Sequence, residues 1–506
     1  MIIKNCTNFK RWIFNHKEIG REKDVHITKC IYIDCIMTEH IACFLPRFLY
    51  ACGLRKKEPF YEIIAICNKD DRVVKEIAAS YGIKLISMKK WISTIEAILL
   101  SLYVFVFKNN EKSIYDLTYH DVEIGKYLAD YLIRFTEDLF CVKKIRFKDL
   151  KKVMVFFKPI IEISKVYKSN HPDIYLAHET GYIYGPIIKM AESYGAQIVK
   201  CTAGNMLIEI GAGTDIPISP IDIWNYLVHR RVEMIDEGNI DYRSWANRYY
   251  KLRRLGKTDR DASDAYANRI IYNRDEWIKK NKVDSNKKNI VIMAHCFSDD
   301  ANTTTSRSIY RDYYQWLICT LEIIQKIDNV NWLLRAHPGR GVYNEGDYVY
   351  KIFEKYAHKG NIYILEDDIS SESLYDIIDG AVTVLGTCGL EFSSFGIPVV
   401  CAGLASYGGF GFTFEPKTEV EYVEYLSNMD KLERLSDTQI DMARKVSYAY
   451  FNLAEPADEF DSLFNCSLKM EKEQGNDFLI KELNKLYENG IKETDSYFYK
   501  MARGDN

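Results

Sequence analysis

The sequence lacks the cysteine patterns that bind zinc or cross-link small domains. Its 13 cysteines are scattered singly along 506 residues, with no CxxC pair and no cysteine–histidine cluster at zinc-binding spacing. The odd number and the missing framework exclude a disulfide-rich scaffold. They indicate reduced thiols, as in a cytoplasm.

The chain also has no excess of basic charge. Its 68 Lys and Arg residues are balanced by 71 Asp and Glu residues, for a net charge of −3. Proteins that bind duplex nucleic acid usually carry a basic excess. We therefore expect no nucleic-acid partner.

Long hydrophobic runs are missing too. The longest uncharged apolar run covers residues 97–107, and its 11 residues are fewer than the ~20 that a membrane span needs. We expect this run to form a buried helix or strand. The first 20 residues contain no apolar core of a secretory signal, so we expect a cytoplasmic protein.

Two parts of the chain alternate apolar strands with amphipathic helices, which is typical of parallel α/β sheets. The expected strands are residues 30–35, 61–67, 83–87, 173–178 and 197–201 in the first part, and 289–294, 331–335, 361–365, 380–385 and 398–402 in the second. Ligands of such folds bind at the carboxyl ends of the strands, in a cleft.

The pattern predicts four segments. Residues 1–222 and 289–420 are each expected to form a doubly wound, Rossmann-like α/β domain, and the two domains to face a cleft. Residues 223–288 are charged and poor in strand formers, which predicts a helical insert and a linker. Residues 421–506 are expected to be a helical C-terminal segment.

The strongest motif follows the strand expected at residues 380–385. Gly386 permits a tight turn with close backbone approach, and a helix is expected to begin near Gly389. Its free N–H groups suit a phosphate, and Thr387 adds a hydroxyl. Glu391 either accepts the two hydroxyls of a ribose or only complements the helix dipole. Ser393 either packs or reaches a phosphate.

A second motif is the strand that runs into His337 and Pro338. Proline ends the strand, so His337 is expected to project at the carboxyl edge of the sheet. Its imidazole can donate to a phosphate or a base. Arg335 and Arg340 can offer bidentate forks to phosphate. The alternative is a turn with surface arginines.

Two further loops follow strands of the second domain. His295 and Ser298 come after the first strand and are expected to face the cleft, although a capping turn fits equally well. The adjacent pair Asp299 and Asp300 could ligate a metal, but no third carboxylate follows at metal-binding spacing. We therefore expect no metal. Tyr407 lies in a glycine-rich loop that either touches a sugar or base or is a plain surface turn.

The first domain has its own carboxylates near expected strand ends or helix starts. Glu179 and Asp121 are the candidates for a general base, which must face the cleft within reach of a hydroxyl. Residues 143–158 hold seven basic residues and one acid among apolar ones. This segment either contacts an anionic membrane or glycan or is an ordinary amphipathic helix.

These motifs together resemble a family. The sequence RAHP at 335–338, the block at 386–400 and the loop ending at 416 look like the bacterial capsule and surface-polysaccharide glycosyltransferases of the GT-B fold, including those that use CMP-linked Kdo. Elements of the motifs also resemble bacterial sialyltransferases. The first-domain stretches 44–49 and 123–134 look like members of the same group.

The resemblance implies a nucleotide-sugar donor bound mainly by the second domain, with the acceptor on the side of the first. His337 would contact the nucleotide phosphate, Gly386 and Gly389 would cradle it with Thr387, and Glu391 would hold the ribose. His295 and Ser298 would face the donor. GT-B enzymes usually need no catalytic metal, because helix dipoles and basic side chains stabilise the leaving phosphate.

We therefore expect a glycosyltransferase that moves a sugar from a CMP-, UDP- or GDP-activated donor to a growing capsule or lipopolysaccharide glycan, with no cofactor besides this co-substrate. A glycan or glycolipid would be the acceptor, and peripheral contact with the inner membrane would be possible. Three alternatives stay open: a nucleotide-sugar 2-epimerase, a CDP-glycerol-type glycerophosphotransferase and a non-catalytic nucleotide-binding scaffold.

Overall fold

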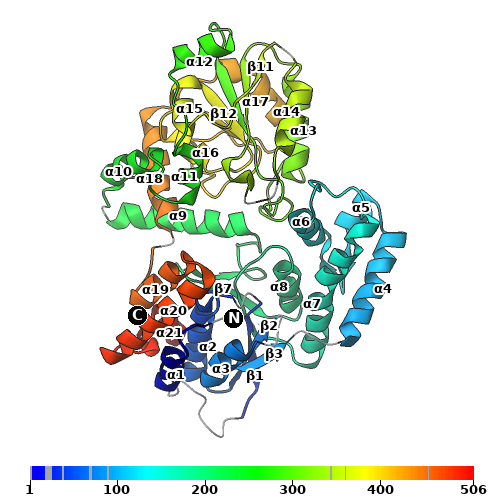
Figure 1. The fold of residues 1–506 in the computed structure, drawn as a ribbon, viewed down its shortest axis with the longest axis vertical. Helices are drawn as coiled ribbons and strands as arrows, with labels where there is room; N and C mark the ends of the chain where they lie inside the picture. Colours follow the sequence, from blue (N-terminus) through cyan, green and yellow to red (C-terminus); the bar gives the residue numbers. More distant parts are fainter. Residues whose placement is uncertain are drawn as a thin grey trace. The chain divides into compact units, whose positions relative to one another are not determined.

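The computed structural model forms two compact units, each built around its own sheet (Figure 1). The first unit comprises Met1–Leu128, Lys144–Ile218 and Leu453–Asn506, and the second comprises Ala129–Lys143 and Ser219–Asn452. The described residues are 3–16, 26–36, 39–67, 71–87, 91–204, 206–238, 240–341, 343, 345–358, 360–453 and 455–505.

The sheet of the first unit has six strands in the order β3-β2-β1-β6-β7-β8. Its strands are β1 (Lys29–Asp34), β2 (Tyr61–Cys67), β3 (Lys84–Ser87), β6 (Ile174–Ala177), β7 (Gln197–Thr202) and β8 (Met206–Ile210). The first five are parallel and confirm the expected strands. Strand β8, which was not predicted, runs antiparallel to β7 at the edge of the sheet. Its fourth residue, Glu209, is exposed and interrupts the apolar pattern.

Helices cover this sheet and extend beyond it. They are α1 (Cys6–Asn15), α2 (Leu45–Lys57), α3 (Arg72–Ser80), α4 (Trp91–Phe107), α5 (Glu111–Tyr115), α7 (Leu150–Ser169) and α8 (Tyr184–Ser193), with the short strands β4 (Thr118–Tyr119) and β5 (Val122–Glu123). Helix α6 (Gly125–Phe135) begins in the first unit, and its residues from Ala129 on belong to the second. Helix α3 shows why they form: Asp71 caps the free N–H groups of Val73 and Val74, and Val74 and Ile77 are buried one turn apart.

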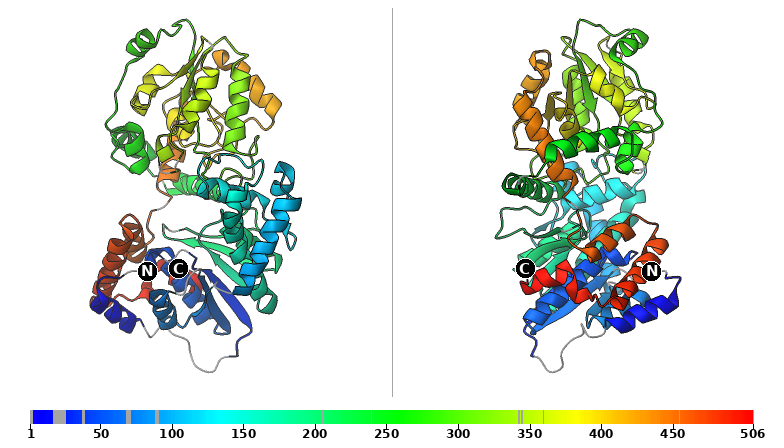
Figure 2. Two further views of the ribbon diagram at one scale, coloured as in Figure 1. Left: turned by 45° about the vertical axis from the view of Figure 1, so that its right-hand side comes forward. Right: turned by 90° about the vertical axis from the view of Figure 1, so that its left-hand side faces the viewer.

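The C-terminal helices belong to the first unit. Helices α19 (Glu459–Leu468), α20 (Lys472–Glu488) and α21 (Tyr497–Arg503) pack beside α1 and α2, as the red and blue ribbons of Figure 2 show. Phe464 and Leu483 lie in the same core cluster as Trp12 and Phe48. The structure therefore differs from the predicted separate segment 421–506, because these helices bury apolar side chains in the core of the first unit, beside α1 and α2.

The sheet of the second unit has five parallel strands in the order β11-β10-β9-β12-β13. They are β9 (Asn289–Met293), β10 (Asn331–Arg335), β11 (Ile362–Ile364), β12 (Gly380–Thr383) and β13 (Val399–Cys401), which confirms all five expected strands. The chain thus contains two parallel α/β sheets of the Rossmann type, as predicted.

The helices of the second unit include the region that was expected to be an insert. They are α9 (Pro220–Gly238), α10 (Tyr242–Arg254), α11 (Arg260–Tyr266), α12 (Arg274–Asn281), α13 (Tyr313–Ile324), α14 (Tyr348–Tyr356), α15 (Ser371–Ile377), α16 (Cys388–Ser393), α17 (Glu419–Ser427) and α18 (Asp437–Phe451). Residues 223–288 are not a separate insert. Tyr250 of α10, for example, is buried and shares hydrogen bonds with Ser394 and Ser447.

The apolar run at 97–107 forms the second half of α4, and the expectation that it would be buried is wrong for one face. Ala97, Ser101 and Val104 are buried, whereas Leu99 and Val106 are more than 60% exposed. Within the described residues, no helix is both long and apolar enough to cross a membrane.

Candidate functional site

The candidate site is a pocket in the second unit, at the carboxyl ends of its three central strands. Strands β9, β10 and β12 end at Met293, Arg335 and Thr383, and the loops that follow them line the pocket. The wall is formed by Arg253, Asp264, Ala265, Tyr266, Met293, Ala294, His295, His337, Pro338, Gly339, Ser371, Thr383, Gly386, Thr387, Cys388, Glu391 and Phe392. This is the edge at which ligands bind in parallel α/β folds.

His295 is held at the floor of this pocket in one tautomer. Its Nε2 lies 3.3 Å from the Leu385 N–H and 3.0 Å from the Thr383 hydroxyl. The Leu385 amide can only donate, so Nε2 accepts and the proton of the neutral ring lies on Nδ1. Burial lowers the pKa of His295 to about 3, so the ring is uncharged at neutral pH.

His337 has the opposite arrangement. Its Nδ1 accepts the backbone N–H of Gly339 at 3.1 Å and lies 3.2 Å from the thiol of Cys296. The proton of the neutral ring is therefore on Nε2, and no described residue bonds to that atom. Burial lowers the pKa of His337 to about 4, although the nearby Asp264 acts in the other direction. His337 thus offers the pocket a neutral N–H donor.

The turn between β12 and α16 forms another wall. A Cβ on Gly386 would lie 3.1 Å from the Thr383 hydroxyl and 3.4 Å from His295 Nε2, so glycine allows the backbone to pass close to both. Thr387 precedes α16, and its hydroxyl caps no helical N–H. The N–H groups at the start of this short helix have no partner within the helix.

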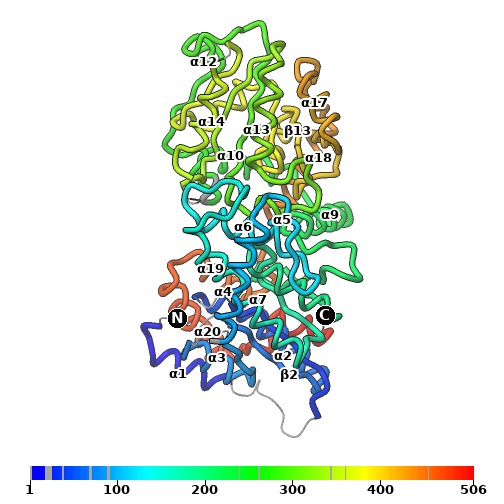
Figure 3. Tube along the Cα trace, turned by 90° about the vertical axis from the view of Figure 1, so that its right-hand side faces the viewer, coloured from blue at the N-terminus to red at the C-terminus, as the bar shows by residue number. Residues whose placement is uncertain are grey.

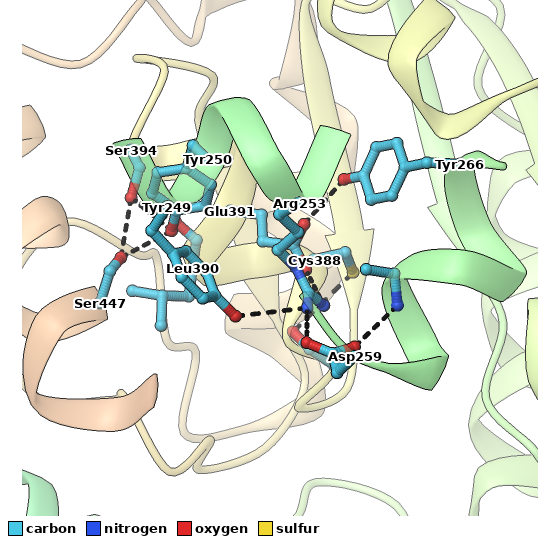
Figure 4. A network of polar contacts seen from close by, with 12 residues as sticks. Tyr249, Tyr250, Arg253, Asp259, Tyr266, Cys388, Leu390, Glu391, Ser394 and Ser447 are labelled. Atoms are coloured by element: carbon cyan, nitrogen blue, oxygen red, sulfur yellow. Dashed lines mark hydrogen bonds and ion pairs between the residues drawn. The ribbon is translucent and has the colours of Figure 1, made fainter. Parts of the chain in front are cut away.

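Glu391 lies in a buried polar network (Figure 4). One carboxylate oxygen accepts from Arg253 Nη2 at 2.9 Å, and the other accepts from the Tyr266 hydroxyl at 2.7 Å. Arg253 also contacts Asp259 at 2.7 Å. Both side chains of the Arg253–Glu391 pair are 6% exposed. The pair fixes the carboxylate in the pocket wall with lone pairs left to accept further hydroxyls.

Five predicted donor residues are therefore brought together in one pocket. They are His295, His337, Gly386, Thr387 and Glu391. Neutral donors, backbone amides and a fixed carboxylate suit a ligand that carries phosphate oxygens at one end and vicinal hydroxyls at the other.

Three other predicted residues do not line this pocket. Arg335 is 2% exposed, and its guanidinium donates to the carbonyls of Glu366 and Ile369, both at 2.6 Å. Arg340 pairs with Asp367. Ser298 donates to Glu345 at 3.1 Å. Their hydrogen-bonding groups bind other residues of the second unit. This differs from the prediction that the two arginines bind a phosphate and that the serine faces the sugar donor.

The remaining predicted donor residues lie behind the wall. Gly389 is buried, and a Cβ there would collide with the Tyr407 hydroxyl. Tyr407 is fully buried and donates to the Gly386 carbonyl. Ser393 is also fully buried. Tyr407 and Gly389 therefore shape the turn that carries Gly386, and the predicted direct contacts of Tyr407 and Ser393 are not seen.

The sequence analysis missed the contribution of residues 223–288 to the pocket. Arg253, Asp264 and Tyr266 come from α10 and α11 and form part of its wall. Because residues 223–288 contain few strand-forming residues, the sequence predicts a helical insert and linker there. No local pattern marks Arg253, because its partners Asp259 and Glu391 are identified only by the tertiary contacts of α10.

The two predicted catalytic carboxylates lie in the first unit. Glu179 follows β6 at the carboxyl end of that strand, is half exposed and lies 4.0 Å from His178 Nε2. Asp121 is exposed and has a positive φ of 64° in the turn between β4 and β5. Each is accessible to solvent in its own unit, and the choice between them stays a prediction.

A metal site was not expected, and the described ranges contain no group of three His, Cys, Asp or Glu side chains arranged to hold one. Asp299 is exposed. Among the ionisable groups of the pocket, Arg253 and Glu391 form an ion pair with each other.

Comparisons with solved structures find distant likenesses. A β-Kdo 2,4-transferase, KpsC of Thermosulfurimonas dismutans, is 13% identical at a TM-score of 0.33, covering 61% of this chain and 93% of that chain. An Anabaena protein, Alr3699/HepE, solved with UDP-glucose, is 12% identical at 0.26, covering 90% and 100%. The UDP-GlcNAc 2-epimerase of Neisseria meningitidis is 9% identical at 0.23, covering 91% and 100%. No curated protein matches the chain.

The family comparison is more specific. Residues 225–448 match the family described as capsule polysaccharide biosynthesis protein. This span falls within the Ser219–Asn452 segment of the second unit and contains every residue that lines the pocket. The resemblance predicted from the sequence motifs is thereby confirmed for this span: residues 225–448, a little under half of the chain, are similar to the capsule polysaccharide biosynthesis proteins.

Proposed function

We propose that this protein is a glycosyltransferase that uses a nucleotide-activated sugar to extend a capsule-type polysaccharide, and that the pocket of the second unit binds the donor. The observation that carries the proposal is the joint presence of His337, the turn at Gly386 and Glu391 around one pocket. A nucleotide sugar presents a phosphate and a ribose diol, which need donors and an acceptor respectively.

The phosphate would lie against neutral donors. His337, which has no described partner on Nε2, and the residues Thr387 and Cys388 at the start of α16 line the pocket wall. The charge of the leaving phosphate would be stabilised by these preoriented donors as it develops. The carboxylate of Glu391, oriented by Arg253 and Tyr266, would accept the ribose hydroxyls.

The transfer itself would be attack by an acceptor hydroxyl on the anomeric carbon. The bond from that carbon to the phosphate oxygen breaks, the nucleotide leaves with the electron pair, and a carboxylate of the first unit takes the hydroxyl proton. Glu179 and Asp121 are the candidates. A glycan or lipid-linked acceptor would place the reaction in the cytoplasm, at the inner face of the inner membrane.

Ligand-induced thermal stabilisation tests the donor site. CMP, CDP, UDP and GDP are added separately, and we expect one of them to raise the melting temperature of the second unit, since a hundred-fold excess over Kd stabilises the native state by ~2.7 kcal/mol. His337→Ala and Glu391→Gln should each abolish the shift. His358→Ala, at an exposed histidine of the same unit, is the matched control and should keep it.

Turnover then separates the alternatives. Sugar transfer to an acceptor supports the proposal. Conversion of donor without acceptor would identify an epimerase, and transfer of glycerol phosphate from CDP-glycerol would identify a glycerophosphotransferase. Binding without any turnover would identify a scaffold. A nucleotide shift that survives in the double variant His337→Ala/Glu391→Gln would reject the assigned pocket.

A further inference from the structure

Helix α4 exposes a line of large apolar side chains along one face. Ile92, Leu99 and Val106 stand seven residues apart and are 61–63% exposed. At 3.6 residues per turn this spacing puts them in one line along the helix. The same face also exposes Ile95, Ile98, Leu102, Tyr103 and Phe107.

The opposite face of α4 is part of the first unit. Ser93, Ala97, Ser101 and Val104 are buried, and α4 packs along α7, outside it in Figure 1 and beside it in Figure 3. The one charged residue of α4, Glu96, pairs with Lys165 of α7 at 2.7 Å. The helix is therefore held in place by one side and presents the other to its surroundings.

Basic residues flank one end of this apolar face. The segment before α7 is tied to the C-terminal end of α4, because Asn109 exchanges two hydrogen bonds with the backbone of Ile145. The ring of Phe147, 78% exposed, contacts Phe105 of α4. Lys144 and Lys148 of this segment and Lys151 in the first turn of α7 are exposed, whereas the acid Asp149 is buried and paired with Arg146.

We propose that this surface, the exposed face of α4 with Phe147 and Lys144, Lys148 and Lys151, docks the protein onto an anionic lipid bilayer. An apolar strip bordered by cations matches a membrane interface, where acyl chains lie next to lipid phosphates. Helix α4 is 17 residues long and lies on the unit rather than free of it, so it would lie in the plane of the interface and not cross the membrane.

The apolar residues and the lysines of this surface would have separate roles in membrane binding. The apolar strip would insert between headgroups and hold the protein, and its contribution would persist at high salt. The lysines would attract the anionic surface, and their contribution would fall as salt screens it. Neither role depends on the nucleotide pocket of the second unit.

Vesicle flotation tests the surface with the full chain. Wild type should float with vesicles of phosphatidylcholine and phosphatidylglycerol, and less with phosphatidylcholine alone. Leu99→Glu/Val106→Glu should lower binding at least roughly ten-fold, because two carboxylates would have to leave water. The matched control Leu255→Glu/Val420→Glu changes two exposed apolar residues of the second unit and should float like wild type.

A second pair of variants tests the charge. Lys144→Glu/Lys148→Glu/Lys151→Glu should weaken binding to the anionic vesicles by roughly five-fold or more for each lysine. The control Lys75→Glu/Lys469→Glu/Lys481→Glu makes the same change of net charge at exposed lysines elsewhere on the first unit, and should bind like wild type. Circular-dichroism melting and the nucleotide-induced shift should be unchanged in all variants, which separates failure here from failure of the donor-site proposal.

Two results would overturn the docking surface. One is that wild type does not float with anionic vesicles, or that Leu99→Glu/Val106→Glu floats equally well. The other is that light scattering shows a wild-type dimer which this variant converts to a monomer, without any vesicle binding. In that case the α4 face would be an interface between two copies of the chain.

Discussion

The two sheets of this protein use buried ionisable side chains at their carboxyl ends in different ways. In the first unit, Arg47 is 1% exposed and donates to the carbonyls of Asp34 and Cys201, both at 3.0 Å. It joins the ends of two strands. In the second unit, His295, His337 and Glu391 stand at the same edge of the sheet but line a pocket.

The difference shows that a buried ionisable side chain can serve either the stability of the fold or the binding of a ligand. A buried cation that bonds two main-chain carbonyls and a neighbouring imidazole, as Arg47 does, joins parts of the fold and stabilises it. A buried group held by some of its hydrogen bonds, with further donors or lone pairs facing a cavity, is prepared for one. His337, fixed through Nδ1 and free at Nε2, is of the second kind.

The largest expected effect comes from breaking the buried pair of the second unit. Arg253→Met leaves the carboxylate of Glu391 buried without its cation, which should lower the free energy of unfolding by ~3–5 kcal/mol and abolish the nucleotide-induced thermal shift. Arg47→Met should destabilise the first unit and leave the nucleotide shift intact. Urea unfolding and thermal shift measure the two quantities.

A double variant provides the control for that experiment. In Arg253→Met/Glu391→Gln the uncompensated charge is gone, so much of the lost stability should return while nucleotide binding stays weak. If Arg47→Met and Arg253→Met reduced nucleotide binding equally, the contrast between the two edges would be wrong.

A smaller effect concerns pH and the buried Glu493 of the first unit. This carboxyl group accepts from Trp12 Nε1 at 2.8 Å and from the Tyr81 hydroxyl at 2.9 Å, and burial raises its pKa from 4.5 to about 7. Because the folded state favours the protonated form, its contribution is present below pH 4.5 and is lost as the pH rises through 7.

We therefore expect the first unit to lose up to ~3 kcal/mol of stability between pH 4.5 and 8 through this group, and Glu493→Gln to flatten the curve. In the second unit, burial likewise raises the pKa of Glu345 to about 7, and Glu345→Gln should flatten the curve of that unit alone. Melting temperatures across this pH range measure both, and parallel curves for wild type and variant would contradict the assignment.

The smallest expected loss of stability comes from replacing either of two buried glycines by alanine. A Cβ at Gly53 of α2 would press on the Tyr499 carbonyl and Ala502, and one at Gly389 would collide with Tyr407. Each change to alanine should cost ~1–3 kcal/mol through overpacking. Only Gly389→Ala should also weaken nucleotide binding, since Tyr407 bonds the Gly386 carbonyl.

Gly341→Ala is the matched control, because a Cβ there meets nothing within 4 Å, and it should change neither quantity. Nucleotide binding by Gly389→Ala that equals wild type, at a temperature where the variant is folded, would show that the turn at Gly386 does not depend on Tyr407.

Much of the fold could be predicted because burial acts on local sequence. Strands such as β2 and β10 are short runs of apolar residues that are buried along almost their whole length, so they can be recognised without knowing their neighbours. The edge strand β8 was missed because it is half exposed and includes Glu209. For the apolar run at 97–107 the sequence left helix and strand open, and which face of the resulting helix α4 is covered depends on α7.

The residues of the pocket likewise divide into those that the sequence predicts and those that only the structure identifies. His337 and Gly386 could be found because each follows a recognisable strand, and parallel strands end at one edge. Arg253 and Tyr266 could not, since α10 and α11 are brought to the pocket by packing on distant residues such as Ser447. Arg335 looked like a phosphate ligand, and only its burial shows that backbone carbonyls occupy its guanidinium.

The amino-acid sequence by itself determined the two parallel α/β sheets, the strand ends that carry His295, His337 and Gly386, and the family to which they point, because hydrophobic period and strand-ending residues act over a few positions. Tertiary structure alone decided that residues 453–506 complete the first unit, that Arg253 fixes Glu391 and that α4 leaves an apolar face open. These features depend on contacts between residues far apart in the chain, and the energies of such contacts leave no local pattern.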